Sequence, residues 1–263
     1  NIKVKMLLKP GAESHTFEPT PEDIKTIKSS DIFIYVGGDS DEWVDDILSD
    51  IDTDKTKVIK LIDLVDAKEE VTTEGMESDE EDESEEEAEL DEHVWTSPKN
   101  AIEIINKLKK EIINIDNDEK SNLESNANDY VNKLNDLDTE FKSIVKTAKR
   151  KEIIVGDRFP LRYFADEYGL SYYAAFPGCS EQTEASAKTI SFLANKVKED
   201  KIPVVLKIEL SSGNIANTIA KETNTKVLEF NSAHNISQSD FDAGTTYVDI
   251  MTKNVEVLKE ALN

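Results

Sequence analysis

The chain has 263 residues, of which 31 are Lys or Arg and 56 are Asp or Glu, so its formal net charge at pH 7 is −25. This acidity excludes nucleic acid and anionic lipid surfaces as partners, because their phosphates need a basic face, and it favours cations. A hydrophobic content of 38% over this length is enough for two ordinary domains, and a single cysteine, Cys179, excludes an internal disulfide.

Strands and helices alternate in the first part of the chain. Short apolar runs that end at Pro or Gly predict strands, and a Thr-Pro pair at residues 20 and 21 predicts a helix start. The expected order is a strand at 3–8, a helix at 20–30, a strand at 31–38, a helix at 40–51 and a strand at 57–64. This βαβαβ order predicts an α/β lobe.

An acidic tract interrupts the alternation. Residues 77–92 contain twelve acids and no basic residue. Such a segment repels itself and stays solvated, so we expect a disordered loop over 69–92. The tract either collects metal weakly or serves only as a solubilising segment.

The second half of the chain begins with two helical patterns. Ser97 and Pro98 open a helix that runs to about residue 115, and a longer pattern covers 117–149. A helix of that length spans roughly 50 Å and could bridge two lobes. Alternation then resumes, with strands expected at 152–156, 171–176, 202–210 and 226–230 and helices at 160–169, 185–200, 212–224 and 240–262. The strands are continuous apolar runs, as in a parallel sheet covered on both faces.

Only three histidines occur, His15, His93 and His234. His15 and His234 follow strands, and His93 lies between the acidic tract and the helix at 98. Because loops at the carboxyl ends of parallel strands line one crevice, we expect the three imidazoles to share a cleft. Three neutral imidazoles and an oxygen form a four-coordinate site of the kind that Zn²⁺ prefers, whereas Ca²⁺ and Mg²⁺ need mostly oxygen ligands.

Four segments of the chain resemble one known family. The stretches GAESHTFEPTPEDI and DEHVWTSPKNA resemble the two histidine motifs of the metal-binding subunits of zinc and manganese ABC importers, and YFADEYGL and GCSEQTEAS resemble segments of that family's second lobe. The resemblance implies two α/β lobes, 1–116 and 151–263, joined by a long helix at 117–150, with the metal in the cleft between them. It also implies one further β-strand and helix ahead of residue 1.

One position departs from the family pattern. Relatives usually carry a histidine or glutamate ligand where this sequence has Arg158, and a protonated guanidinium cannot ligate a metal. The family's last ligand falls near Asn231, and His234 lies three residues further on. We infer that His15, His93 and His234 are the metal ligands. The fourth position stays open among Asp157, Glu181, Glu184, Asn231 and water.

Neighbouring residues allow two interpretations each. Trp95 lines the site or packs in the core, and Glu18 orients a ligand imidazole or is a surface charge. Cys179 is a thiolate ligand or a small buried hydrophobe. Arg158 holds a carboxylate near the metal or points to solvent.

The resemblance implies a solute-binding protein outside the cytoplasm, either a cell-surface lipoprotein or periplasmic. It would capture Zn²⁺ as cargo and deliver it to the membrane permease of an ABC importer, and we expect a monomer. A Mn²⁺-binding member of the family is the alternative. A zinc hydrolase is less favoured, because no H-E-x-x-H or G-x-S-x-G stretch occurs and no histidine is left over for proton transfer. We therefore expect no enzyme.

Overall fold

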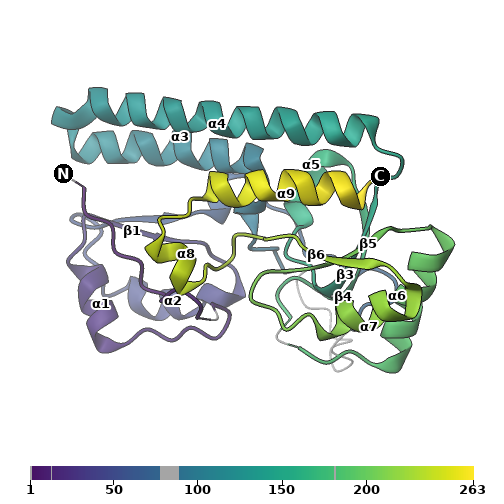
Figure 1. Cartoon of the computed structure of the whole chain (residues 1–263). Helices are drawn as coiled ribbons and strands as arrows, with labels where there is room; N and C mark the ends of the chain where they lie inside the picture. Colours follow the sequence, from purple (N-terminus) through teal and green to yellow (C-terminus); the bar gives the residue numbers. More distant parts are fainter. Residues whose placement is uncertain (1, 13, 78–88, 181) are drawn as a thin grey trace.

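Two α/β lobes lie side by side beneath a pair of long helices (Figure 1). The computed structural model describes residues 2–12, 14–77, 89–180 and 182–263. The predicted fold class, two lobes with parallel sheets joined by one long helix, is confirmed. Within the described residues, no helix is both long and apolar enough to cross a lipid bilayer.

The N-terminal lobe is built on a two-stranded parallel sheet. Its elements are α1 (Pro21–Lys28), β1 (Ile32–Tyr35), the short 3-10 helix η1 (Asp39–Asp41), α2 (Trp43–Leu48), β2 (Lys57–Lys60) and η2 (Ile62–Leu64). Thr20 caps α1 as predicted, since its side chain accepts from the Asp23 backbone N–H and the Asp23 carboxylate accepts from the Thr20 N–H. Ile27, Phe33 and Val44 form the core of this lobe.

The strand predicted at 3–8 is wrong. These residues have no regular secondary structure, and the Val4 side chain is 91% exposed. A strand is defined by hydrogen bonds to a neighbouring strand, and residues 3–8 pair with none in the described part of the chain. An alternating pattern alone therefore does not create a strand.

The two long helices are close to their predicted positions. They are α3 (Pro98–Ile115) and α4 (Lys120–Thr147), separated by the 3-10 turn η4 (Asn117–Glu119). Ser97 accepts from the Asn100 N–H and caps α3, as its position before Pro98 predicts. Figure 1 shows α4 extending over both lobes. The division into lobes at 116 and 151 stays a prediction.

The C-terminal lobe has a four-stranded parallel sheet in the order β4-β3-β5-β6. Its elements are β3 (Glu152–Arg158), α5 (Arg162–Tyr168), β4 (Ser171–Phe176), α6 (Ala187–Glu199), β5 (Val204–Lys207), α7 (Asn214–Thr223), β6 (Lys226–Glu229), α8 (Gln238–Asp242) and α9 (Tyr247–Ala261). The sheet is buried on both faces, one packed against α6 and α7 and the other against α4, α5 and α9. This explains the continuous apolar strands.

The single helix predicted at 240–262 is two helices. The chain breaks at Gly244, whose φ of +74° is a left-handed conformation that glycine adopts easily. Thr246 and Asp249 then form a new capping box at the start of α9. The turn residues between the helices therefore override the apolar periodicity.

The loop predicted to be disordered over 69–92 is ordered at both ends. The Glu70 N–H donates to the Glu89 carbonyl at 2.8 Å, and the Asp91 N–H donates to the Lys68 carbonyl at 2.8 Å. The Glu77 N–H donates to the Ala175 carbonyl at the end of β4, so the segment reaches the second lobe. The rest of the prediction falls on residues 78–88, which lie outside the described residues.

Phe141 links α4 to the second lobe. Its ring is fully buried and lies edge-to-face against Phe164 of α5, with 4.9 Å between ring centroids. We expect Phe141→Ala to lower the free energy of unfolding by about 3–5 kcal/mol, because it removes buried apolar area and leaves a cavity. Urea denaturation measures this loss. The matched control is Glu140→Ala on the exposed face of the same helix, and an equal loss in both variants would contradict the packing role.

Candidate metal site

His93 is the most deeply buried histidine of the site. Its side chain has no solvent exposure, and it directly precedes the short 3-10 helix η3 (Val94–Thr96). The Asp91 carboxylate lies 3.0 Å from His93 Nδ1 and also accepts from the His93 backbone N–H at 2.8 Å. Because an ionised carboxylate only accepts, the proton is on Nδ1 and the Nε2 lone pair is available. Among the described residues, the buried Nε2 atom has no hydrogen-bond partner.

His15 approaches from the loop that precedes α1. Its side chain is 4% exposed, and Nε2 lies 3.2 Å from Glu92 Oε1. On the other side of the ring, Arg158 Nη1 lies 3.4 Å from Nδ1. A guanidinium only donates, so Nδ1 accepts and Nε2 carries the proton towards Glu92. A metal that binds at Nε2 must displace that proton.

His234 enters from the second lobe, in the loop after β6. Its ring centroid lies 4.7 Å from that of His15 and 5.1 Å from that of His93, and the centroids of His15 and His93 are 5.8 Å apart. Its Nε2 atom hydrogen-bonds the Ser14 hydroxyl. The structure thus brings the three predicted imidazole rings close together, although His234 is not in the group of donor atoms formed by His15, Glu92, His93 and Cys179. The role of the histidines as ligands stays a prediction.

A buried carboxylate fixes the loop that carries His234. Glu209 follows β5 and is 8% exposed. It accepts from the Ser232 N–H and hydroxyl at 2.7 Å each and from the His234 N–H at 3.0 Å. Trp95 Nε1 also donates to the Ser232 carbonyl at 3.0 Å, and its ring lies edge-on to His234 with 5.6 Å between centroids. Trp95 therefore both lines the site and joins the lobes.

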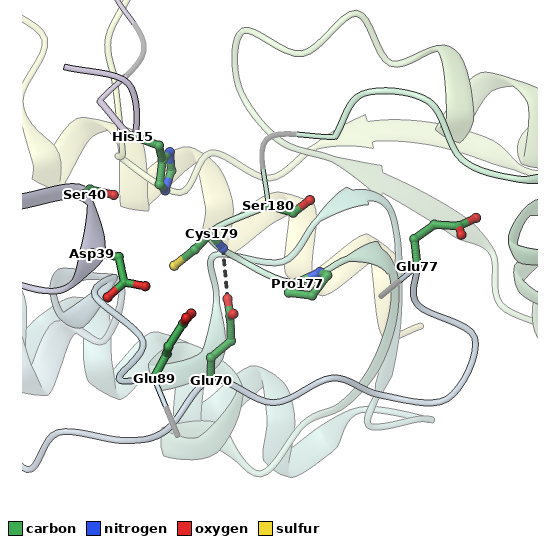
Figure 2. Close-up of a pocket in the computed structure, with 9 residues that line it drawn as sticks. All are labelled: His15, Asp39, Ser40, Glu70, Glu77, Glu89, Pro177, Cys179 and Ser180. Carbon is green, nitrogen blue, oxygen red and sulfur yellow. Dashed lines mark hydrogen bonds between the residues drawn. The ribbon is translucent and has the colours of Figure 1, made fainter. Parts of the chain in front are cut away.

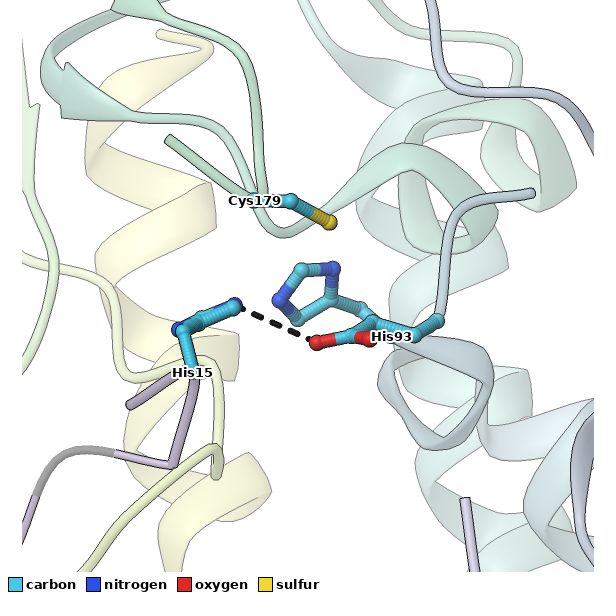
Figure 3. Close-up of side chains that lie close together, drawn as sticks. His15, His93 and Cys179 are labelled. Carbon is cyan, nitrogen blue, oxygen red and sulfur yellow. Dashed lines mark ion pairs between the residues drawn. The ribbon is translucent and has the colours of Figure 1, made fainter. Parts of the chain in front are cut away.

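A fourth side chain of the site, Glu92, is absent from the sequence prediction. One donor atom each from His15, Glu92, His93 and Cys179 lies within 4.8 Å of the others. Figure 3 shows His15, His93 and Cys179 converging around the carboxylate that His15 contacts. In the sequence Glu92 is one of twelve acids in a tract, so nothing there separated it from the solvated ones. The signal available was its position beside a ligand-type histidine.

Glu92 remains ionised despite its burial. Burial would raise the pKa of its carboxyl, but hydrogen bonds from His15 and from the Ser40 hydroxyl bring that pKa below its usual value. Cys179 behaves in the opposite way. Burial raises the pKa of its thiol, and the carboxylates of Glu70, Glu92 and Asp91 raise it further, so the thiol is protonated in the absence of a metal.

The other candidates for a fourth ligand lie outside this group of donor atoms. Asn231 Oδ1 accepts from the Ala233 N–H at 2.8 Å, and Glu184 is exposed. Asp157 Oδ1 accepts from the Arg158 N–H, while its buried Oδ2 has no hydrogen-bond partner within the described ranges. Glu181 is not among the described residues. Glu18 is exposed, which favours its interpretation as a surface charge.

An acidic cavity of about 240 Å³ adjoins His15 (Figure 2). The residues that line it are His15, Asp39, Ser40, Glu70, Glu77, Glu89, Pro177, Cys179 and Ser180. The Cys179 backbone N–H donates to Glu70 Oε1 at 2.9 Å, which holds the loop after β4 against the cavity. Four carboxylates around one opening create a negative potential that concentrates cations.

Buried imidazoles and a carboxylate between two α/β lobes define a metal-binding protein of the solute-binding class. The chain belongs to the ZnuA family, described as zinc-uptake complex component A, periplasmic, whose family model matches residues 1–261. Membership places the chain among transport proteins and not among enzymes.

Curated relatives match nearly the whole chain. The high-affinity zinc uptake system protein ZnuA of Bacillus subtilis (strain 168) is 34% identical over 98% of this chain and 80% of its own length. The zinc-binding lipoprotein AdcA of Streptococcus pneumoniae (strain ATCC BAA-255 / R6) is 31% identical over 98% of this chain. The chain spans 51% of the length of that second relative.

Solved structures share the fold. The Zn(II)-bound ZnuA-like domain of Streptococcus pneumoniae AdcA matches with a TM-score of 0.77 and 30% identity, covering 99% of this chain and 90% of that one. The metal-dependent lipoprotein YcdH from Bacillus subtilis matches with a TM-score of 0.81 and 30% identity, covering 99% and 91%.

The Glu209 contacts generate a test of how the site is held. We expect Glu209→Gln to lower the free energy of unfolding by about 1.5–3 kcal/mol, because a buried charged acceptor of several hydrogen bonds is lost. Hydrogen exchange should show faster exchange at the Ser232 and His234 amides. The control is Glu229→Gln, whose exposed carboxylate pairs with Lys207 and should matter little. Unchanged amide protection in Glu209→Gln would contradict this role.

Proposed function

We propose that this chain captures one Zn²⁺ ion in the cleft between its lobes and delivers it, outside the cytoplasm, to the membrane permease of an ABC importer. The observation that carries the proposal is the buried His93 Nε2, which has no hydrogen-bond partner among the described residues and faces two other imidazoles. A buried polar atom without a partner is costly unless a ligand satisfies it. A metal ion satisfies it directly.

His15, His93 and His234 are the proposed imidazole ligands. A zinc-bound imidazole has its ring centre about 3.2 Å from the metal, so two such rings at a tetrahedral angle have centres about 5 Å apart. The three centroid separations of 4.7, 5.1 and 5.8 Å fit this spacing. Small side-chain rotations would then turn the ring nitrogens towards one point.

The donor chemistry favours zinc over manganese. Imidazole nitrogens suit Zn²⁺, whereas Mn²⁺ prefers more oxygen ligands and binds a given site more weakly in the Irving–Williams order. The named relatives are zinc-uptake and zinc-binding proteins, which supports the same choice. Zn²⁺ is therefore cargo that leaves unchanged, and no bond is made or broken.

The finer assignments are also proposals. A lipid anchor is supported by the name of the AdcA relative, a zinc-binding lipoprotein, while the description of the family as periplasmic supports a free protein in that space. We propose that the chain acts as a monomer, because the chain by itself supplies four clustered donor side chains, which is as many as a zinc site needs.

Metal titration tests the function. We expect one tight Zn²⁺ site per chain and Mn²⁺ binding at least about 100-fold weaker. Each of His15→Ala, His93→Ala and His234→Ala should weaken zinc binding by a similar large factor, because each removes one imidazole. Competition against a chromophoric zinc chelator measures these affinities. Equal affinities for the two metals would contradict the zinc assignment, and parental binding by His234→Ala would remove that residue from the ligand set.

Zinc affinity should depend on pH in one direction. Ligand imidazoles must be neutral, and an unperturbed histidine has a pKa near 6.5. As the pH falls below about 6, protons compete with zinc for each imidazole, so the affinity should fall steeply, by more than one power of ten per pH unit if several histidines ligate. Calorimetry between pH 5 and 8 measures the slope. A flat profile would exclude histidine ligation.

A further inference from the structure

We propose that the Glu92 carboxylate is the fourth zinc ligand and replaces the ligand that Arg158 displaces from the second lobe. This inference rests on the proposed zinc-binding function. It assigns to Glu92 a role that the adjacent histidine motif does not predict, and it means that His15, Glu92 and His93 bind the metal from one side of the cleft, with His234 opposite.

The distances fit a shared metal. Two ligand atoms at 2.0–2.1 Å from one zinc ion and at a tetrahedral angle are about 3.3 Å apart. Glu92 Oε1 lies 3.2 Å from His15 Nε2. Both residues belong to the group, with His93 and Cys179, whose donor atoms lie within 4.8 Å of one another. A zinc ion that displaces the His15 proton can therefore bind both atoms with little movement of either.

The site around Glu92 is built to hold a carboxylate there. Its side chain is 5% exposed, and Oε1 accepts from the Ser40 hydroxyl at 2.5 Å. Gly38, with a φ of +93°, leaves the space for the other oxygen, since a Cβ at this position would lie 2.8 Å from Glu92 Oε2. The turn that follows β1, with η1, therefore positions the carboxylate so that Oε1 faces His15, where a metal that displaces the His15 proton would bind it.

Charge also favours Glu92. A buried Zn²⁺ with three neutral imidazoles would carry its full charge beside the Arg158 cation, which lies 3.4 Å from His15 Nδ1. An ionised carboxylate bound to the metal offsets part of that repulsion. Cys179 is the competing candidate in the same group of donor atoms.

Glu92→Gln tests the role with little change in shape. The glutamine carbonyl can still accept from the Ser40 hydroxyl and His15, so the variant loses the negative charge and the long 3.3 Å contact of Oε2 with the Ser40 N–H. Zinc affinity should fall by more than about 100-fold, beyond the 10–100-fold typical of residues that only orient a ligand. The matched control is Glu103→Gln, which removes the same charge from an exposed side chain on α3 that does not line the cavity and should change affinity by less than about threefold at physiological salt.

Loading with Co²⁺ provides a second readout. A thiolate ligand gives Co²⁺ an intense sulfur-to-metal charge-transfer band, whereas imidazole and carboxylate ligands do not. We expect the parent protein to lack this band and Cys179→Ser to bind zinc like the parent. A strong band that disappears in Cys179→Ser would assign the fourth position to sulfur and overturn the proposal.

The outcomes separate the two proposals. If the parent binds zinc tightly and Glu92→Gln binds as tightly, the Glu92 assignment fails while the proposed function stands. If the parent itself has no tight site, both fail. Should Glu92→Gln not fold, Glu92→Asp keeps the charge but shortens the side chain by one methylene. It should then weaken zinc binding by at least about tenfold, and parental affinity in that variant would contradict direct ligation.

Discussion

The site depends on the contact between the Asp91 carboxylate and the His93 imidazole. Both side chains are buried, and the 3.0 Å separation of Asp91 Oδ1 from His93 Nδ1 fixes which ring nitrogen faces the cleft. The same residue also links to the second lobe through its backbone, because the Tyr163 hydroxyl on α5 donates to the Asp91 carbonyl at 2.6 Å. A change of the Asp91 side chain would therefore alter the orientation of the His93 ring and leave this backbone contact in place.

The lobes are held together in two different ways. Along α4 they share a buried apolar core that includes Leu134 and Phe141 and contains none of the residues of the metal site. At the cleft the contacts are polar and between loops, such as the Gly11 N–H donating to Asn235 Oδ1 at 3.0 Å. A metal bound by residues of both lobes would add cross-links beside these polar contacts. Its binding energy should therefore appear as added stability of the folded chain.

Sequence reasoning predicted most of the fold because each strand and helix carries a local signal. The Thr20 and Ser97 side chains cap their helices as predicted. The apolar runs of the second lobe form strands because neighbouring strands are present to pair with them. The segment at 3–8 has the pattern without a pairing strand, and the helix at 240–262 contains a turn that periodicity overlooks. Both errors concern contacts or turns that a linear pattern does not record.

For the site, the sequence predicted the three histidines but not Glu92. Histidines are rare in this chain, so each one is noticeable, whereas glutamates are abundant and most are exposed. What distinguishes Glu92 is three-dimensional: the Ser40 hydroxyl, the space left by Gly38 and the approach of His15. Burial and these contacts, which a sequence pattern does not record, separate Glu92 from the exposed acids around it.

The central claim is that one zinc ion lies between the lobes at these side chains. Anomalous diffraction at the zinc absorption edge, on crystals of the zinc-loaded protein, locates the metal directly. The account predicts a single strong peak between the imidazoles of His15, His93 and His234. A peak confined to the exposed acidic residues, or none at the three imidazoles, would contradict it.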